Sequence, residues 1–550
     1  MTPEESARQF IAHEGEFHLG FLPTEQANPV TAQLSGAAQN SAQDGCALLL
    51  DVDARMRPAL QTAFSSPSYP ALQRLMEDTF RAGGRVVFSG CGATGRLALL
   101  LEGAWREWAS GSAAEAVRGI MTGGDYAFIR SVESFEDYEA FGARQIEALR
   151  VGPRDCVVGI SEGGETSSVL GSVRAARAAG ARAAFVCNNP HSLLRERIAR
   201  SRRVLEDPSI VCLEIDTGPM ALSGSTRMQA TTSELLVVGT ALEAASAVFV
   251  PCADREQQPG PVAAFGGLVD ALHRADNLAA LGRWVELEAE CYGAAGAVTY
   301  YAERALIDIL TDTTERTPTF ALPPFQPHGT TGVARPWAMV NGLAGDTAAT
   351  WRAMLGREPV CLEWAAGDYA AMGAEARIVA NPPRIDRQAL SAFHIGNEPD
   401  ASRYQHAADT AVFIFTAADS ADAGRFAPAV GRVRVAYPRS VCVVVGQGSG
   451  ADGVDCIRID CPLPVSRLRL WEHLALKLVC NTVSTATMAR LGRVTGNWMT
   501  HVQPTNKKLI DRATRILCGC LGIGYEDACT RLFRELARTD APLAERPSPV

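Results

Sequence analysis

The sequence predicts an α/β protein made of two three-layer units with parallel sheets, followed by a helical C-terminal segment. Short apolar stretches alternate with helical stretches, which is typical of a parallel sheet covered on both faces. The alternation breaks at a segment rich in proline, glycine and polar residues and then restarts. We therefore expect an N-terminal wrap and helix over 1–59, a first unit over 60–248, a linker over 249–277, a second unit over 278–492 and a helical segment over 493–550.

The first unit shows the clearer pattern. Apolar runs between turn residues predict strands at 86–89, 117–121, 156–160, 183–187 and 210–215. Apolar residues at helical spacing predict helices at 60–81, 97–108, 129–149, 166–179 and 225–247. Ligands of parallel sheets bind beyond the carboxyl ends of the strands. The glycine-rich turns of this unit follow two of those ends.

The second unit is interpreted as an altered copy of the first. Strands are expected at 297–301, 359–364, 411–416, 441–445 and 456–459, and helices at 278–292, 304–310, 421–431 and 466–489. The first of these strands runs into Tyr300-Tyr301-Ala302-Glu303, where the first unit has a glycine turn. The pattern therefore predicts a pseudo-dimer with one altered half. From Lys507 onward, apolar residues at core spacing predict a helical tail.

Composition limits the classes of partner. The chain has 550 residues, too many for one ordinary core, and its 47% hydrophobic residues supply ample core material. A net charge of -9 without a long basic run argues against nucleic acid or an anionic membrane as partner. No signal peptide and no membrane-spanning run is recognisable. Fifteen scattered cysteines favour buried thiols in a reducing cytoplasm, and we expect no metal and no cofactor.

Two glycine-rich turns are the main candidates for a binding site. The segment 85–96, RVVFSGCGATGR, places Gly92 and Thr94 between a strand and a helix start. The segment 159–166, GISEGGET, places Ser161, Gly163 and Thr166 in the same way. Free backbone N–H groups and the positive end of a helix favour an anion there, and a pair of such loops suits a phosphomonoester. The alternative is a tight turn with a threonine helix cap, and Glu162 and Glu165 count against phosphate unless they point away.

Further polar residues suggest a third anion site and an acid/base pair. Ser225 and Arg227 lie in LSGSTRM at the start of a long helix, where a simple helix cap is the alternative. Lys477 lies in an apolar helix, from which it reaches either the surface or an anion. The candidate acids and bases are Glu133, Glu136, Asp137 and Glu315, for which a solvated surface position is the alternative.

These motifs together resemble the sugar isomerase (SIS) domain. SEGGET is similar to its Ser-x-Ser-Gly-Glu-Thr phosphosugar loop, with Gly163 in place of the second serine. Three segments are similar to parts of N-acetylmuramic acid 6-phosphate etherases and of glucokinase regulatory protein, namely GCGATGRLA, LSGSTRMQA and the run from Lys477 to Leu509. LPTEQANP is similar to the N-terminal region of glucokinase regulatory protein. The resemblance implies two SIS-type units plus a helical cap, as in the tandem regulator; the etherase has one unit and dimerises.

The resemblance also implies roles for particular residues. By position it implies a phosphosugar site formed by Gly92, Thr94, Ser161, Gly163, Thr166, Ser225, Arg227 and Lys477. Glu136 matches one catalytic glutamate of the etherases, and Glu315 of the second unit matches the other, which Ala104 replaces in the first unit. The chain departs from the family pattern at Ala93, Thr94, Glu165 and Arg316.

Two functions follow from the resemblance. The favoured hypothesis is a binding protein that holds a hexose or N-acetylhexosamine 6-phosphate between its units and signals occupancy, with a sugar kinase as partner. The alternative is an etherase-type lyase, in which one carboxylate takes the C2 proton and another assists loss of D-lactate. Aldose–ketose isomerisation is a weaker third option. Monomer and dimer both remain open.

Overall fold

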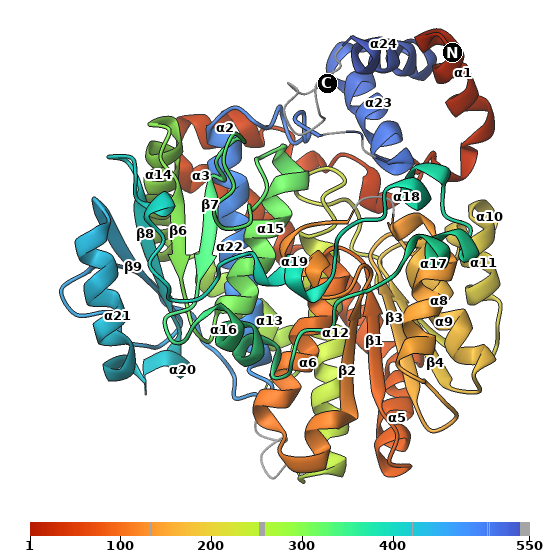
Figure 1. Cartoon of the computed structure of the whole chain (residues 1–550), viewed down its shortest axis with the longest axis horizontal. Coiled ribbons are helices and arrows are strands. Elements are labelled where there is room, and N and C mark those ends of the chain that lie inside the picture. Colours follow the sequence, from red (N-terminus) through yellow and green to blue (C-terminus); the bar gives the residue numbers. More distant parts are fainter. Residues whose placement is uncertain (133–134, 252–258, 421, 503, 505, 539–550) are drawn as a thin grey trace.

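The computed structural model describes residues 1–132, 135–251, 259–420, 422–502, 504 and 506–538. Two α/β halves lie side by side, and the terminal helices lie together at one end of the molecule (Figure 1). None of the helices in the described part of the chain has the length and apolar character needed to cross a lipid bilayer. The fourteen cysteines described are all free thiols.

The first half is built on a five-stranded parallel sheet with the order β2-β1-β3-β4-β5. Val86 of β1 pairs with Val117 of β2 on one side and with Cys156 of β3 on the other. The strands are β1 (Val86–Gly90), β2 (Val117–Met121), β3 (Cys156–Ser161), β4 (Arg182–Cys187) and β5 (Ile210–Glu214). The helices are α5 (Ser68–Arg81), α6 (Ala93–Trp108), α7 (Tyr126–Ile129), α8 (Glu139–Ala148), α9 (Ser167–Ala178), α10 (His191–Arg197), α11 (Ala199–Leu205) and α12 (Gln229–Ala245).

The second half repeats this topology. Its parallel sheet has the order β10-β9-β8-β6-β7, so β6, β7, β8, β9 and β10 correspond to β1 through β5. The strands are β6 (Val298–Tyr301), β7 (Ala338–Asn341), β8 (Thr410–Phe415), β9 (Arg439–Val445) and β10 (Asp455–Ile459). The helices are α14 (Ala275–Gly293), α15 (Leu306–Phe320), α16 (Thr347–Leu355), α17 (Ala366–Ala371), α18 (Ala376–Ala380), α19 (Arg387–Ser391), α20 (Ala417–Ser420), α21 (Ala423–Ala436) and α22 (Leu470–Arg490). The predicted fold class of two parallel α/β units is confirmed.

One predicted strand is wrong. Residues 359–364 form no strand, and the edge strand beside β6 is β7 instead. The segment crosses to the first half, where Asp125 N donates to the Val360 carbonyl and Val360 N donates to the Asp125 carboxylate. Leu362 is buried there in a cluster with Phe135 of the first half and Tyr369 of α17. Its apolar side chain is therefore buried between the two units rather than by a sheet.

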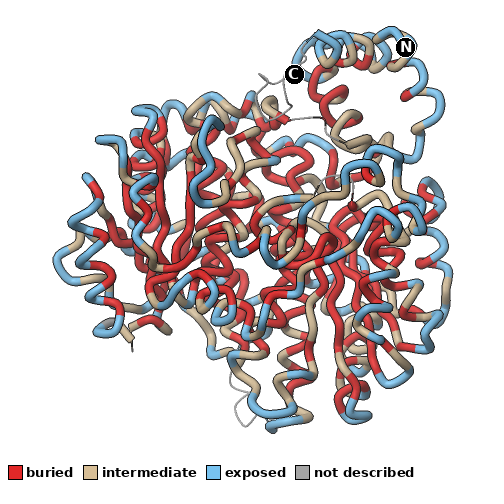
Figure 2. The backbone as a smooth tube through the Cα atoms, in the orientation of Figure 1, coloured by how far each residue is buried: buried red, intermediate tan, exposed pale blue. Residues whose placement is uncertain are grey.

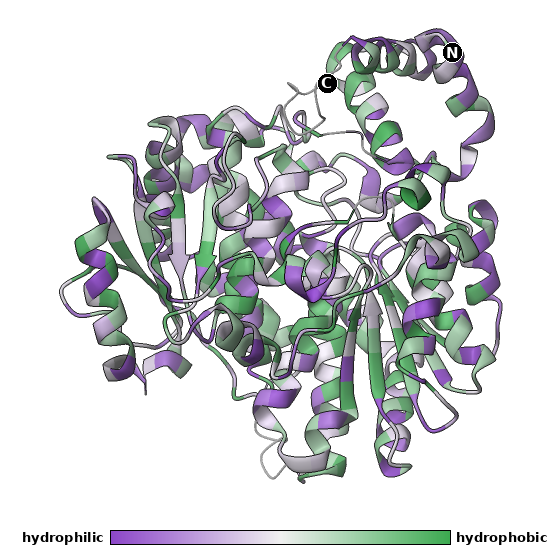
Figure 3. Cartoon of the chain, in the orientation of Figure 1, coloured by the Kyte–Doolittle hydropathy of each residue, from purple (hydrophilic) through white to green (hydrophobic). Residues whose placement is uncertain are grey.

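The two halves share one hydrophobic core. Buried residues of both sheets, of α12 and of α22 belong to a single cluster, and Figure 2 shows buried backbone running through both halves without a break. The strands of both sheets are among the most hydrophobic parts of the chain (Figure 3). Within the segment expected as linker, residues Pro261–Leu272 form α13. The halves therefore have little freedom to move apart without exposing apolar surface.

The C-terminal tail covers the carboxyl end of the first sheet and is joined there by part of the N-terminal segment. The N-terminal segment contains α1 (Pro3–His13), α2 (Leu34–Asn40), α3 (Ala42–Ala54) and α4 (Arg57–Ser65), and the tail contains α23 (Lys507–Leu521) and α24 (Tyr525–Ala537). Ala7 and Phe10 of α1 are buried against Cys529 of α24. The buried carboxylate of Glu25 pairs with Arg512 and Arg515 of α23. This pairing fixes α23 over the glycine-rich turns of the first half.

Candidate functional site

A cavity of ≈ 480 Å³ lies where the loops after β1 and β3 meet α15 and the start of α23. Three helix N-termini reach it, because Gly92 and Ala93 begin α6, Thr166 precedes α9, and Asn506 caps α23. Helix N-termini carry unsatisfied N–H groups and a partial positive charge. The cavity is therefore suited to a negatively charged group.

The loop between β1 and α6 is shaped by its glycines. A side chain at Gly90 would lie 2.3 Å from the backbone carbon of Thr94, and Gly92 has a φ of +57°. The hydroxyl of Thr94 is buried and exchanges hydrogen bonds with the backbone of Cys91. Gly92 thus lines the cavity, whereas Thr94 holds the loop from behind.

The loop between β3 and α9 contains a threonine that lines the cavity and a serine that lies behind it. Thr166 lines the cavity. Ser161 is fully buried, and its hydroxyl donates to Thr166 Oγ1 at 3.0 Å. The carbonyl of Gly163 accepts a hydrogen bond from Asn189, which fixes the turn. Ser161 and Gly163 therefore support Thr166 and lie outside the cavity lining.

The two glutamates in this loop have different surroundings. Glu165 pairs with Arg200 and Lys508 at 3.0 and 2.9 Å, and these cations outweigh burial to hold its pKa below the ordinary value. Glu162 lines the cavity, and burial raises its pKa to about 7 against the opposing effect of Lys508. The charge of Glu165 is thus neutralised by partners, and Glu162 holds a proton over part of the neutral range.

Glu136 and Glu315 line the same cavity although 179 positions separate them in the sequence. Glu315 lies on α15 of the second half and is ion-paired with Arg96, which is fully buried on α6. Glu136 lies in the short helix Phe135–Asp137 and accepts a hydrogen bond from the Asn506 side chain at 2.7 Å. Both halves therefore contribute a carboxylate to one site.

The two other acidic candidates near Glu136 are Asp137 and Glu133. Burial, with Glu165 nearby, raises the pKa of Asp137 to about 6. Asp137 is not among the residues that line the cavity. Glu133 lies outside the residues that the structure describes.

The tail supplies residues that the sequence did not single out. Asn506, Lys508 and Arg512 line the cavity from α23, which begins about 340 positions after Thr166. The Asn506 side chain accepts a hydrogen bond from Leu509 N and so caps this helix. An asparagine cap followed by two lysines is a sequence signal for an anion-facing helix start, but nothing in the sequence connects it to the first half.

Ser225, Arg227 and Lys477 lie apart from the cavity. Arg227 is buried and bonds to Asp312 at 2.9 Å and to Thr485 at 2.8 Å. Lys477 donates to the backbone carbonyl of Arg227, and burial together with Arg227 lowers its pKa to about 8. Ser225 is buried in the preceding loop. Arg227 and Lys477 line a separate space of ≈ 40 Å³ and connect the two halves.

The equivalent edge of the second sheet is occupied by carboxylates of the chain itself. Glu303, after β6, accepts hydrogen bonds from the N–H groups of Leu343 and Ala344, both at 3.1 Å. Asp419, after β8, accepts from Thr416 N at 2.9 Å and from Arg304 N at 3.3 Å. N–H groups at the strand ends of the second half are therefore already paired with negative charge.

Two solved structures superpose on part of this chain. The C-terminal domain of glucosamine-fructose-6-phosphate aminotransferase from Francisella tularensis superposes with a TM-score of 0.45 at 11% identity, covering 80% of this chain and 94% of that one. Tagatose-6-phosphate ketose/aldose isomerase from Escherichia coli gives 0.45 at 12%, covering 83% and 95%.

Sequence relatives are closer. Residues 70–177 match the model of the glucokinase regulatory protein N-terminal SIS domain. N-acetylmuramic acid 6-phosphate etherase 1 of Bacillus licheniformis is 31% identical over 40% of this chain and 67% of its own length. The etherase of Cutibacterium acnes is 35% identical over 39% and 65%. The chain thus spans about two thirds of the length of these relatives, and it belongs to the SIS-domain family, in the branch of the N-acetylmuramic acid 6-phosphate etherases and glucokinase regulatory protein.

Proposed function

We propose that the ≈ 480 Å³ cavity binds a sugar 6-phosphate and that the chain releases lactate from N-acetylmuramic acid 6-phosphate. The observation that carries the proposal is that Glu136 and Glu315 line one cavity. They are the positions that match the catalytic glutamates of the etherases. The sequence relatives are named as etherases, which favours catalysis over binding alone.

The phosphate would lie at the helix N-termini. Gly92, Thr166 and Lys508 come from three different helix starts around the cavity, and together they offer N–H groups, a hydroxyl and an ammonium group. Hydrogen bonds from charged donors to phosphate oxygens are roughly twice as strong as those between neutral groups. When Glu162 holds its proton, the cavity carries one negative charge fewer, which favours an anionic ligand.

The glutamates would carry out the elimination. One carboxylate takes the proton from C2, beside the open-chain aldehyde. The electrons form a C2=C3 double bond as the C3–O bond breaks, and the departing lactate oxygen takes a proton from the other carboxyl group. The ion pair with Arg96 holds the carboxylate of Glu315 in place at the wall of the cavity.

A second candidate is binding without turnover, coupled to a sugar kinase. It is favoured by the match of residues 70–177 to the regulatory protein and by the presence of two units in one chain. In this case a sugar phosphate stabilises the protein, because it binds the folded state, but no product forms.

The two candidates differ in one measurement. The full chain is incubated with N-acetylmuramic acid 6-phosphate, and D-lactate is followed with a D-lactate dehydrogenase assay. We expect stoichiometric lactate release. A ligand-dependent rise in melting temperature without lactate would favour the binding-only function. Both candidate functions would be contradicted if this compound gave neither lactate nor a rise in melting temperature, and if glucose, fructose and glucosamine 6-phosphates also left the melting temperature unchanged.

Lys508→Met tests the phosphate end of the cavity. We expect the Kd for glucosamine 6-phosphate, measured by calorimetry, to rise about 10- to 100-fold, because a hydrogen bond to a charged group contributes about 1.5–3 kcal/mol. Lys507→Met is the matched control, since Lys507 pairs with Glu14 and does not line the cavity. Equal Kd values for the two variants would place the phosphate elsewhere.

A further inference from the structure

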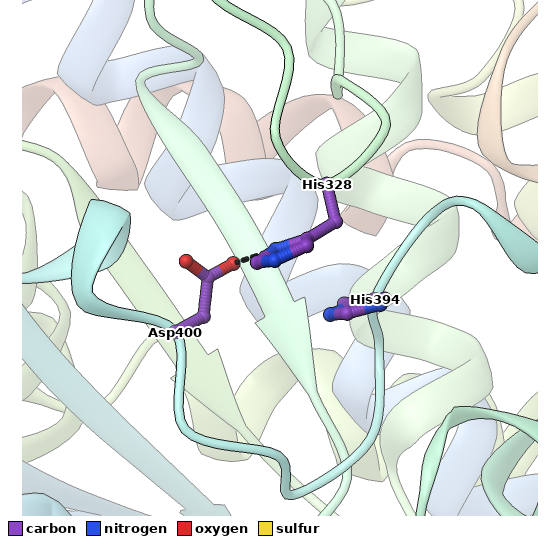
Figure 4. A group of neighbouring side chains, drawn as sticks. All are labelled: His328, His394 and Asp400. Carbon is purple, nitrogen blue, oxygen red and sulfur yellow. Dashed lines mark hydrogen bonds and ion pairs between the residues drawn. The ribbon is translucent and has the colours of Figure 1, made fainter.

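A group of three side chains lies in the long segment between α15 and β8, outside the cavity. His328 follows α15, His394 follows α19, and Asp400 precedes β8. One possible ligand atom from each lies within 4.8 Å of those of the other two. Figure 4 shows the His328 and His394 rings stacked, with Asp400 beside the His328 ring.

The geometry is close to that of a metal site. The Nδ1 of His328 and Oδ2 of Asp400 are 3.3 Å apart. Two ligands at about 2.0–2.1 Å from a tetrahedral zinc ion are themselves separated by about 3.3 Å. The His328 and His394 rings are nearly parallel, at 9°, with centroids 4.0 Å apart. Three-point ligation would require the two rings to turn so that one nitrogen of each faces the same point as the carboxylate.

One ring nitrogen of His394 also points to a ligand. Its Nδ1 is buried and has no hydrogen-bond partner among the described residues. A buried polar atom without a partner costs free energy, so most such atoms in folded proteins are paired. A metal ion bound to this nitrogen would supply the missing partner.

Asp400 is held as a carboxylate beside the two rings. Ser402 donates to its Oδ1 through both N and Oγ, at 3.1 and 2.6 Å. Arg403 Nε donates to Oδ2 at 3.3 Å, and this contact would share that oxygen with a metal ion. Carboxylates that bind metal ions directly are usually held by hydrogen bonds of this kind. His328 is 45% exposed, which leaves a path for an ion to enter.

We propose that His328, His394 and Asp400 bind one transition-metal ion of the zinc class, with water in the remaining position. Two imidazoles and one carboxylate suit Zn²⁺ or Co²⁺, whereas Mg²⁺ and Ca²⁺ prefer oxygen ligands. The ion would join three points of one segment. Pro324, four positions before His328, lines the cavity, and Phe325 packs on Phe393 beside His394. The site would therefore fix one wall of the cavity without taking part in chemistry.

The test titrates metal-free full-length protein with Zn²⁺ by calorimetry and with Co²⁺ by absorption spectroscopy. We expect one equivalent of each ion, and a Co²⁺ spectrum with nitrogen and oxygen ligation and no thiolate charge-transfer band. His328→Ala and His394→Ala should each lower the affinity more than about 100-fold, the upper range for loss of an outer-shell partner alone. His406→Ala, an exposed histidine of the same segment, is the control and should bind as wild type.

Three results would overturn the proposal. The first is no saturable binding, which would mean that the group is a stacked pair held by the His328–Asp400 ion pair. The second is unchanged affinity in both histidine variants. The third is a thiolate charge-transfer band, which would place the ion on cysteines. Circular dichroism of each variant verifies folding, and His328 is exposed enough for its substitution to leave the core intact.

Discussion

Glu315→Gln should lower the rate of lactate release by about 10²–10⁴-fold, the range that general acid–base groups contribute. Glutamine keeps the size of the side chain and can still accept a hydrogen bond from Arg96, but it cannot take up or release a proton. Glu136→Gln should have an effect of the same order, since its amide oxygen can still accept from Asn506. The measurement is the lactate assay at saturating substrate.

Deuterium exchange distinguishes the roles of these two carboxylates. In heavy water, the variant that lacks the acid should still exchange the C2 proton, whereas the variant that lacks the base should not. Glu290→Gln, on the exposed face of α14, is the control and should retain full activity. If both cavity variants release lactate at the wild-type rate, the cavity is not the site of the reaction.

Arg227→Met should destabilise the protein by about 3–5 kcal/mol, the cost of removing one partner of a buried ion pair. The side chain joins the first half to the second, because Asp312 lies on α15 and Asn481 and Thr485 lie on α22. Its loss removes one of the two cations that pair with Asp312 and leaves this carboxylate with Arg316 and the hydroxyl of Ser484. Urea denaturation, followed by tryptophan fluorescence, measures the change.

Two further variants test the cause. Arg439→Met removes an exposed pair with Glu290 and should cost less than about 1 kcal/mol. Arg227→Met combined with Asp312→Leu should lose less stability than Arg227→Met alone, because the under-paired Asp312 carboxylate is then gone and Arg316 keeps its ion pair with Glu288. Wild-type stability of Arg227→Met, together with loss of sugar-phosphate binding, would instead favour the role in the ligand wall that the family resemblance implies.

Local patterns in the sequence predicted the sheets well. The run at 117–121 coincides with β2, and Lys507 begins α23 as expected. Burial on both faces produces continuous apolar runs with glycine at their ends, and this signal needs no knowledge of distant residues. The cavity location at the ends of β1 and β3 followed from the same rule.

The remaining features depend on contacts between distant parts of the chain. Residues 359–364 have the composition of a strand, but Leu362 is buried in a cluster with Phe135 of the other half and Tyr369 of its own half. The family resemblance places Arg227 in a ligand wall. In the structure its guanidinium group is instead ion-paired with Asp312, 85 positions away. Lys508 lines the cavity only because Glu25 holds α23 through Arg512. Residue type and spacing carry no information about such partners.

The carboxylates of Glu303 and Asp419 determine how many ligands one chain can bind. Duplicated units usually raise the expectation of two equivalent ligands, and of communication between them. Here the second half carries its own counter-charges at the strand ends, hydrogen-bonded to Leu343 N and Thr416 N. A sugar phosphate would have to displace a tethered anion to bind there. Saturation should therefore be hyperbolic, with a single equivalent of ligand for each polypeptide.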